Sequence, residues 1–136
     1  ISIEDEKIKL KANEVLEFLK IDNLKNELAG NLSGGQKKLL ELARTMMVDA
    51  KIVFLDEVGA GVNKTLLNDI ADSILRLNKE KGYTFCMIEH DYNLISRLCD
   101  PIIVLAEGNV LFEGTAAEVR ENTEVIESYL GRGVKK

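Results

Sequence analysis

The middle of the chain alternates strand and helix, and this alternation constrains the fold more than any other feature. Residues 51–56 are a short β-branched and aromatic run, which is typical of a buried parallel strand. Asn63 can cap a long helix with apolar positions at helical spacing, and Gly82 ends it. Residues 83–89 form a second apolar strand. This order predicts a parallel sheet covered by helices.

Further elements flank this unit. Apolar positions at helical spacing, Ile8 and Val15 among them, predict an amphipathic helix near residues 4–20. Two apolar runs, 102–105 and 110–112, flank a turn and predict an antiparallel hairpin. A last helix is expected from about 123 to 130, ended by Gly131. A helix that starts near residue 33 carries an apolar stripe of Leu39, Leu40, Ala43, Met46 and Met47.

Composition narrows the class of protein. At 136 residues, with 46% hydrophobic and 30% charged side chains, the chain fits a globular protein with one core. The net charge of −5 argues against a nucleic-acid interface, which needs clustered Lys and Arg. No apolar stretch approaches the roughly 20 residues of a membrane-spanning helix. Cys86 and Cys99 are expected to be reduced core thiols.

A glycine-rich turn at the start of the second helix is a candidate phosphate site. Ser33, Gly34, Gly35 and Gln36 form an S-x-x-Q capping box. Backbone N–H groups at such a helix start are unpaired and can bind an anion, and glycine leaves room for its approach. The capping role alone would also account for Ser33 and Gln36.

Two carboxylates and a histidine follow the predicted strands. Asp56 and Glu57 come after four apolar strand residues, where a metal ion and an attacking water can be held. The alternative is that both simply face solvent. His90, the only histidine, follows the second strand. Because ligands gather at the carboxyl ends of parallel strands, His90 is expected beside Glu57 if the two strands are neighbours.

Together these motifs resemble the ATP-binding cassette (ABC) ATPases. The five residues 32–36 match the signature motif of that family, 52–57 its Walker B strand with the catalytic acid, and 59–63 its D-loop. His90 matches the switch histidine. Segments 57–63, 88–91 and 125–131 resemble importer subunits for branched-chain amino acids, and related importers for amides or urea share much of this sequence.

The P-loop of that family, G-x-x-x-x-G-K-[S/T], does not occur in these 136 residues, and the chain starts at Ile1 without a methionine. We therefore expect the C-terminal part of a longer subunit: an α/β, incomplete P-loop NTPase fold without the P-loop strand. Residues 1–50 would form the helical subdomain with the signature, 51–115 the segment from Walker B to the hairpin, and 116–136 the C-terminal helices. Exposed strand edges predict self-association.

The resemblance implies a sandwich dimer with ATP and Mg²⁺ between two ATPase subunits. Ser33, Gly34, Gly35 and Gln36 would cover the nucleotide held by the P-loop of the other subunit. Asp56 would bind Mg²⁺, Glu57 would polarise the water and His90 would contact the γ-phosphate.

Transmembrane permease subunits would be the further partners of this dimer, at the cytoplasmic face of the membrane, in uptake of a small solute. The chain alone is expected to be inactive. Two alternatives stay open: the C-terminal half of a DNA-repair or chromosome ABC-type ATPase, and a non-catalytic dimerisation module.

Overall fold

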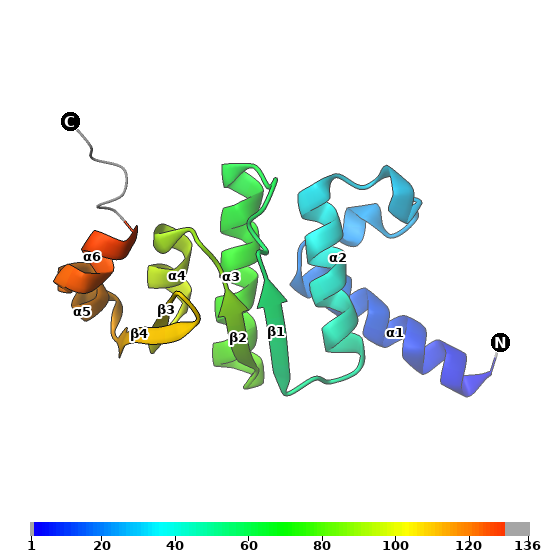
Figure 1. Ribbon diagram of the computed structural model, residues 1–136. Coiled ribbons are helices and arrows are strands. Elements are labelled where there is room, and N and C mark those ends of the chain that lie inside the picture. Colours follow the sequence, from blue (N-terminus) through cyan, green and yellow to red (C-terminus); the bar gives the residue numbers. More distant parts are fainter. Residues whose placement is uncertain (1, 130–136) are drawn as a thin grey trace. The chain divides into compact units, whose positions relative to one another are not determined.

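The computed structural model describes residues 2–129, which divide at residues 88 and 89 into two compact units (Figure 1). Each unit is described by itself. The first holds α1 (Ile3–Phe18), η1 (Asp22–Leu24), η2 (Ala29–Asn31), α2 (Gly34–Met47), β1 (Ile52–Asp56), α3 (Lys64–Lys81) and β2 (Thr84–Ile88). The second holds α4 (Tyr92–Leu98), β3 (Ile102–Ala106), β4 (Asn109–Gly114), α5 (Ala116–Glu121) and α6 (Thr123–Tyr129). The boundaries expected at residues 50 and 115 stay predictions.

The predicted strand–helix–strand unit is confirmed in the first unit. β1 and β2 pair in parallel, from Ile52 opposite Thr84 to Asp56 opposite Ile88, and α3 connects them. Asn63 accepts a hydrogen bond from the N–H of Leu66 and caps α3. Gly82 ends the helix in the left-handed region at φ 70°, where a residue with a Cβ is disfavoured.

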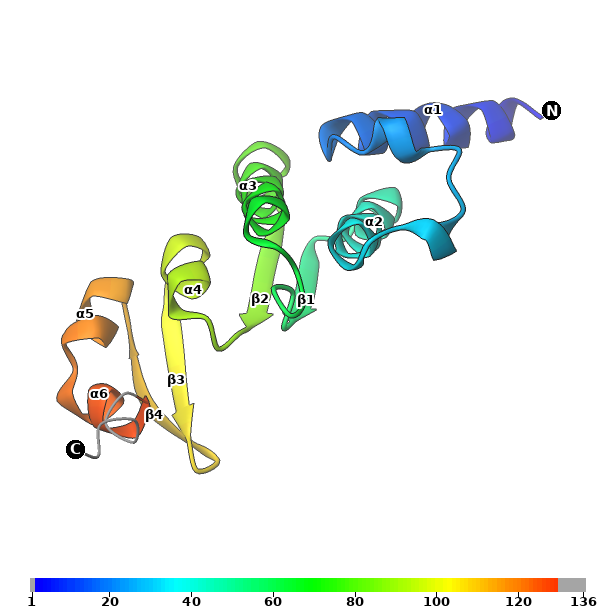
Figure 2. The same ribbon diagram turned by 90° about the horizontal axis from the view of Figure 1, so that it is seen from above.

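The core of the first unit lies between the helices and one face of the sheet. Figure 2 shows α3 running along that face of β1 and β2. In α2 the predicted stripe contributes Leu39, Ala43 and Met46, and Leu42 joins them. The predicted amphipathic helix at the N-terminus is only partly correct, because Ile8 is exposed. The buried apolar side chains of the first unit are Val15, Leu19, Ile21, Leu39, Leu42, Ala43, Met46, Val53, Val58, Ile70, Ala71, Ile74, Leu77 and Tyr83.

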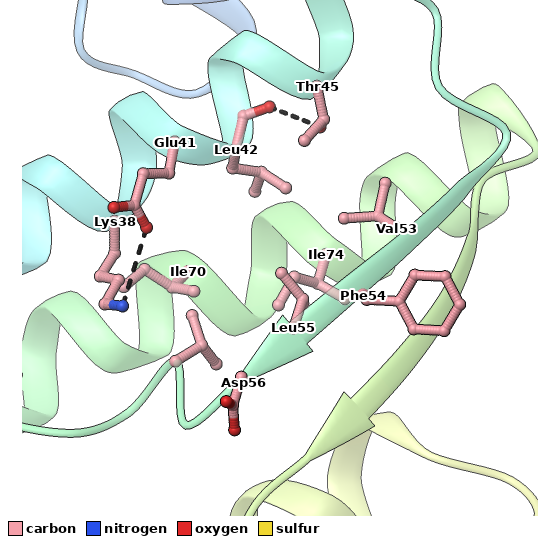
Figure 3. A pocket seen from close by; sticks show the side chains of 11 residues that line it. Lys38, Glu41, Leu42, Thr45, Val53, Phe54, Leu55, Asp56, Ile70 and Ile74 are labelled. Atoms are coloured by element: carbon pink, nitrogen blue, oxygen red, sulfur yellow. Dashed lines mark hydrogen bonds and ion pairs between the residues drawn. The ribbon is translucent and has the colours of Figure 1, made fainter.

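The expectation that β1 is a buried strand is only partly correct. Val53 faces the helices and is 5% exposed, whereas Phe54 is 79% exposed and points away from Leu42 and Ile74 (Figure 3). Ile52 and, on β2, Ile88 are exposed as well. Successive strand residues face opposite sides, and the helices α2 and α3 cover only one side.

Cys86 is a free, exposed cysteine, so it is not the core thiol that was expected. It pairs with Phe54 across the β1–β2 ladder. Strand alternation therefore places both side chains on the uncovered face. Cys99, in the second unit, is half-buried, which is closer to the expectation.

The predicted hairpin forms in the second unit. β3 and β4 pair antiparallel, with an irregularity between Val104 and Leu105. Ile102 and Val104 pack with Val119 of α5 and Val125 of α6 to form a small core. The opposite face carries exposed apolar side chains, Ile103, Leu105 and Val110.

Two short helices, α5 and α6, follow the hairpin. A capping box of Thr115 and Glu118 begins α5. α6 is described to Tyr129, so the stop expected at Gly131 lies outside the described residues. None of the helices in residues 2–129 combines the length and apolar character needed to cross a membrane.

Candidate functional site

The start of α2 is held by the capping box that the sequence predicts. The Ser33 Oγ accepts a hydrogen bond from the N–H of Gln36 at 3.3 Å. The Gln36 Oε1 accepts one from the N–H of Ser33 at 2.8 Å. These two bonds fix the first turn of the helix and satisfy two of its otherwise unpaired N–H groups, those of Ser33 and Gln36.

Gly34 and Gly35 present the remaining N–H groups of this turn. Within residues 2–129, no hydrogen bond uses the backbone N–H of either glycine. Gly34 is exposed, and a Cβ built on it would have only the Gly61 carbonyl oxygen within reach, at 4.0 Å. The turn therefore offers open donors at the positive end of a helix dipole, which suits an anion such as phosphate.

Gly35 has a different environment, because it is buried against the chain itself. A Cβ built there would lie 2.2 Å from Cδ2 of Leu66 and 3.0 Å from Cγ1 of Val62. The distance to Leu66 is shorter than any contact that real Cβ atoms make, and the distance to Val62 is shorter than most of them. Packing of α2 against the start of α3 thus requires glycine at position 35. The sequence motif alone gave no sign of Val62 and Leu66.

Asp56 and Glu57 lie at the carboxyl end of β1, as predicted, and both are exposed. The N–H of Glu57 donates to the carbonyl of Ile88 at 2.9 Å, which extends the contact between the two strands by one residue. Glu57 has a φ of 47°, a conformation that non-glycine residues rarely adopt. The chain therefore turns sharply directly after Asp56.

The loop after these carboxylates is anchored in the first unit. Val58 is 6% exposed and packs into the core. The N–H of Ala60 donates to the carbonyl of Glu57 at 3.1 Å, and that of Val62 to the carbonyl of Gly59 at 3.2 Å. Gly61, at φ 71°, provides the reversal before the Asn63 cap. The loop thereby leads from the carboxylates to the α3 residues that pack on the turn of α2.

His90 is exposed and lies in the second unit, two residues before the start of α4. The neighbouring Asp91 caps that helix, because its Oδ1 accepts hydrogen bonds from the N–H groups of Asn93 and Leu94. Proximity of His90 to Glu57, which lies in the other unit, stays a prediction.

A cavity of about 270 Å³ lies between α2, α3 and β1 (Figure 3). Its lining is largely apolar, and three charged residues, Lys38, Glu41 and Asp56, contribute to it. Lys38 and Glu41 form a loose ion pair at 3.7 Å. The cavity lacks the converging N–H donors of the α2 turn, so it is not the phosphate site.

A magnesium site made by protein side chains alone is not present in the described part of the chain, where no three His, Cys, Asp or Glu side chains form a cluster for a metal ion. Mg²⁺ is commonly held by one or two carboxylates together with phosphate oxygens and water. The exposed oxygens of Asp56 fit that donor set, because they are open to a nucleotide-bound ion.

Comparisons with known proteins agree with this geometry. The "ABC transporter" family matches residues 1–60, and the "Branched-chain amino acid ATP-binding cassette transporter" family matches residues 109–135. A probable branched-chain amino acid transport ATP-binding protein, LivG of Archaeoglobus fulgidus, is 44% identical over 94% of the chain and 49% of its own length. The Pseudomonas aeruginosa protein BraF, a high-affinity branched-chain amino acid transport ATP-binding protein, is 39% identical over 85% of the chain and 46% of its own length.

Solved structures give the same result for the fold. The ADP conformation of MJ1267, an ATP-binding cassette of an ABC transporter, matches with a TM-score of 0.82 and 38% identity, over 92% of this chain and 50% of that one. The cbiO1 protein from Clostridium perfringens matches with a TM-score of 0.80 and 28% identity, over 97% and 54%. The chain spans about half the length of the curated relatives that it matches.

The chain belongs to the ATP-binding cassette ATPases, with the α/β fold of the part that carries the signature turn and the Walker B strand. More narrowly, it is similar, over about half of their length, to the ATP-binding proteins of branched-chain amino acid transporters.

Proposed function

We propose that this chain supplies the signature and Walker B half of the ATPase subunit of an ABC importer, which drives uptake of a small solute such as a branched-chain amino acid or a related amide. One observation carries the proposal: a helix start with two unpaired N–H groups lies next to the loop that follows two exposed strand-end carboxylates. The names of the relatives support the solute class.

In this proposal each candidate residue has one role in binding or hydrolysing the nucleotide. Ser33, Gln36 and the N–H groups of Gly34 and Gly35 bind phosphate oxygens of a nucleotide held on a second ATPase subunit. Asp56 would help to hold the Mg²⁺ of the nucleotide on its own subunit, and this ion would supply charge neutralisation at the phosphates. The carboxylate of Glu57 accepts a proton from the attacking water. His90 contacts the γ-phosphate.

The partners follow from the same proposal. A second copy or a paralogous ATPase subunit completes each nucleotide site, and transmembrane permease subunits carry the solute. The chain would then act at the cytoplasmic face of the membrane. These 136 residues contain no P-loop lysine, so we expect no tight ATP binding and no turnover from the chain alone.

A chimera tests the proposal. The N-terminal half of the Archaeoglobus fulgidus relative, placed before residues 1–136, should give a protein that hydrolyses MgATP, while the chain alone does not. Glu57→Gln should lower the turnover of the chimera about 100-fold or more, because a general base contributes that much. Glu113→Gln, an exposed carboxylate on β4, is the matched control and should leave turnover unchanged.

Two results contradict the proposal. One is ATP turnover by the chain alone at the rate of an intact cassette. The other is a chimera that unfolds cooperatively at a temperature close to that of the parent relative, yet does not hydrolyse ATP.

A further inference from the structure

The two glycines of the anion-binding turn face different neighbours. Gly34 is open to solvent, so its missing side chain leaves room for a ligand. Gly35 is buried, and the space next to its Cα is filled by Leu66 and Val62. Of these two glycines, only Gly35 lies where the chain itself leaves no room for a side chain.

Leu66 links this turn to the carboxylates. It lies in the first turn of α3, and its N–H is held by Oδ1 of Asn63 at 3.0 Å. The loop before it, with its own internal hydrogen bonds, begins at Glu57. A displacement of Leu66 would therefore reach both the turn of α2 and the loop after Asp56.

From these contacts we infer that Leu66, supported by Val62, is a positioning residue for the anion-binding turn. Its side chain packs on Gly35 and sets the depth at which the first turn of α2 rests on α3. The directions of the Gly34 and Gly35 N–H groups depend on that depth. Leu66 touches no phosphate itself. This inference rests on the proposed function, since it concerns how the same site is held in place.

The size of the conflict at position 35 gives the expected effect. Carbon atoms in contact lie about 3.5–4.0 Å apart, and the Cβ of Gly35→Ala would start 2.2 Å from Leu66. The Leu66 side chain or one of the two segments must therefore move by more than about 1 Å, and a misplacement of that size in the turn can cost about 100-fold in rate. We expect a loss of about 10- to 100-fold in kcat and a change in KM for MgATP below about threefold, because the P-loop still holds the nucleotide.

Rescue by a second substitution is the decisive test, made in the chimera described above. Gly35→Ala combined with Leu66→Ala should recover kcat to within about threefold of Leu66→Ala alone, since the smaller side chain makes room for the new methyl group. Leu67→Ala is the matched control, one position along α3, and should not rescue Gly35→Ala.

Gly34→Ala separates positioning from ligand contact. Its methyl group meets no protein atom closer than 4.0 Å, so any loss of activity comes from the ligand side, and Leu66→Ala should not restore it. Rescue of the position 34 variant, or no rescue of the position 35 variant when both proteins unfold like the parent, would overturn the inference.

The isolated chain gives a second, activity-independent test. Leu66→Ala should shift the amide resonances of Gly34 and Gly35, and Leu67→Ala should not. In urea unfolding, Gly35→Ala and Leu66→Ala should be non-additive. An inactive parent chimera would count against the proposed function alone. The positioning role would be refuted if the destabilisations by Gly35→Ala and Leu66→Ala were additive and the amide resonances of Gly34 and Gly35 did not shift. This test holds even if Gly35→Ala is too unstable for kinetic measurements.

Discussion

Phe54→Ser would test whether the uncovered face of the β1–β2 sheet drives self-association. Phe54 is 79% exposed, and full burial of a phenylalanine stabilises by about 1.5–3 kcal/mol. Covering the exposed part in an oligomer would thus contribute about 1.2–2.4 kcal/mol per copy, and its loss would weaken association by about 10- to 50-fold for each Phe54. The monomer should lose less than about 0.5 kcal/mol, because an exposed ring has little packing to lose.

Sedimentation equilibrium over a range of concentrations, with urea unfolding in parallel, measures both quantities. Val53→Ser, one residue away on the covered face, is the contrasting variant, because Val53 is 5% exposed. It should cost about 2 kcal/mol of stability. The reasoning is refuted if the parent chain is monomeric at all concentrations, or if Phe54→Ser associates as strongly as the parent.

Three further predictions concern stability. Leu77→Ala, at a position with 0% exposure, should lower the free energy of unfolding in urea by about 2–5 kcal/mol. Leu28→Ala, at a position with 74% exposure, should change it by less than about 0.5 kcal/mol, and equal effects of the two substitutions would contradict the described core. Gly82→Ala should cost about 1 kcal/mol, measured by thermal unfolding, because φ is 70° there. The hydrogen bond from Lys11, and then the charge of Lys11, lower the pKa of Asp49. This pair therefore stabilises the folded state above the ordinary Asp pKa of about 3.9, and the contribution is lost as the pH falls through the lowered pKa. Lys11→Gln should therefore destabilise at pH 6 and converge with the parent near pH 2; a constant difference would be inconsistent with this linkage.

Local sequence signals predicted most of the first unit correctly. Asn63 and Gly82 bound α3 because a side-chain cap and a left-handed glycine act within one turn of the chain. The capping box of Ser33 and Gln36 can be predicted from the sequence for the same reason. The family match adds the fold that these local elements build.

Burial could not be predicted as well, since it depends on what covers each surface. The apolar run of β1 predicts a buried strand, yet Phe54 is exposed because the helices cover one side only. Cys86 follows the same alternation on β2. The hydrophobicity of a side chain indicates that its burial would be favourable. Burial also requires a neighbouring element that covers the side chain, and this element is not visible in the local sequence.

The candidate site divides in the same way. Residue type and order predicted Gly34, Asp56 and Glu57, because chemistry and strand ends are visible in the sequence. The role of Leu66 was invisible, since it arises from a contact between two helices more than thirty positions apart in numbering, at Gly35 and Leu66. The proximity of His90 to the carboxylates is still a prediction.

The alternation of side chains along β1 decides on which face of the sheet Asp56 lies. Ile52, Phe54 and Asp56 share one side of the strand, and Val53 and Leu55 share the other. Insertion or deletion of one residue between Val53 and Asp56 would turn the carboxylate towards the helices and bring an apolar side chain to its place. The length of this strand can therefore change only in steps of two residues without removing the acid from the edge where it is available to a metal ion.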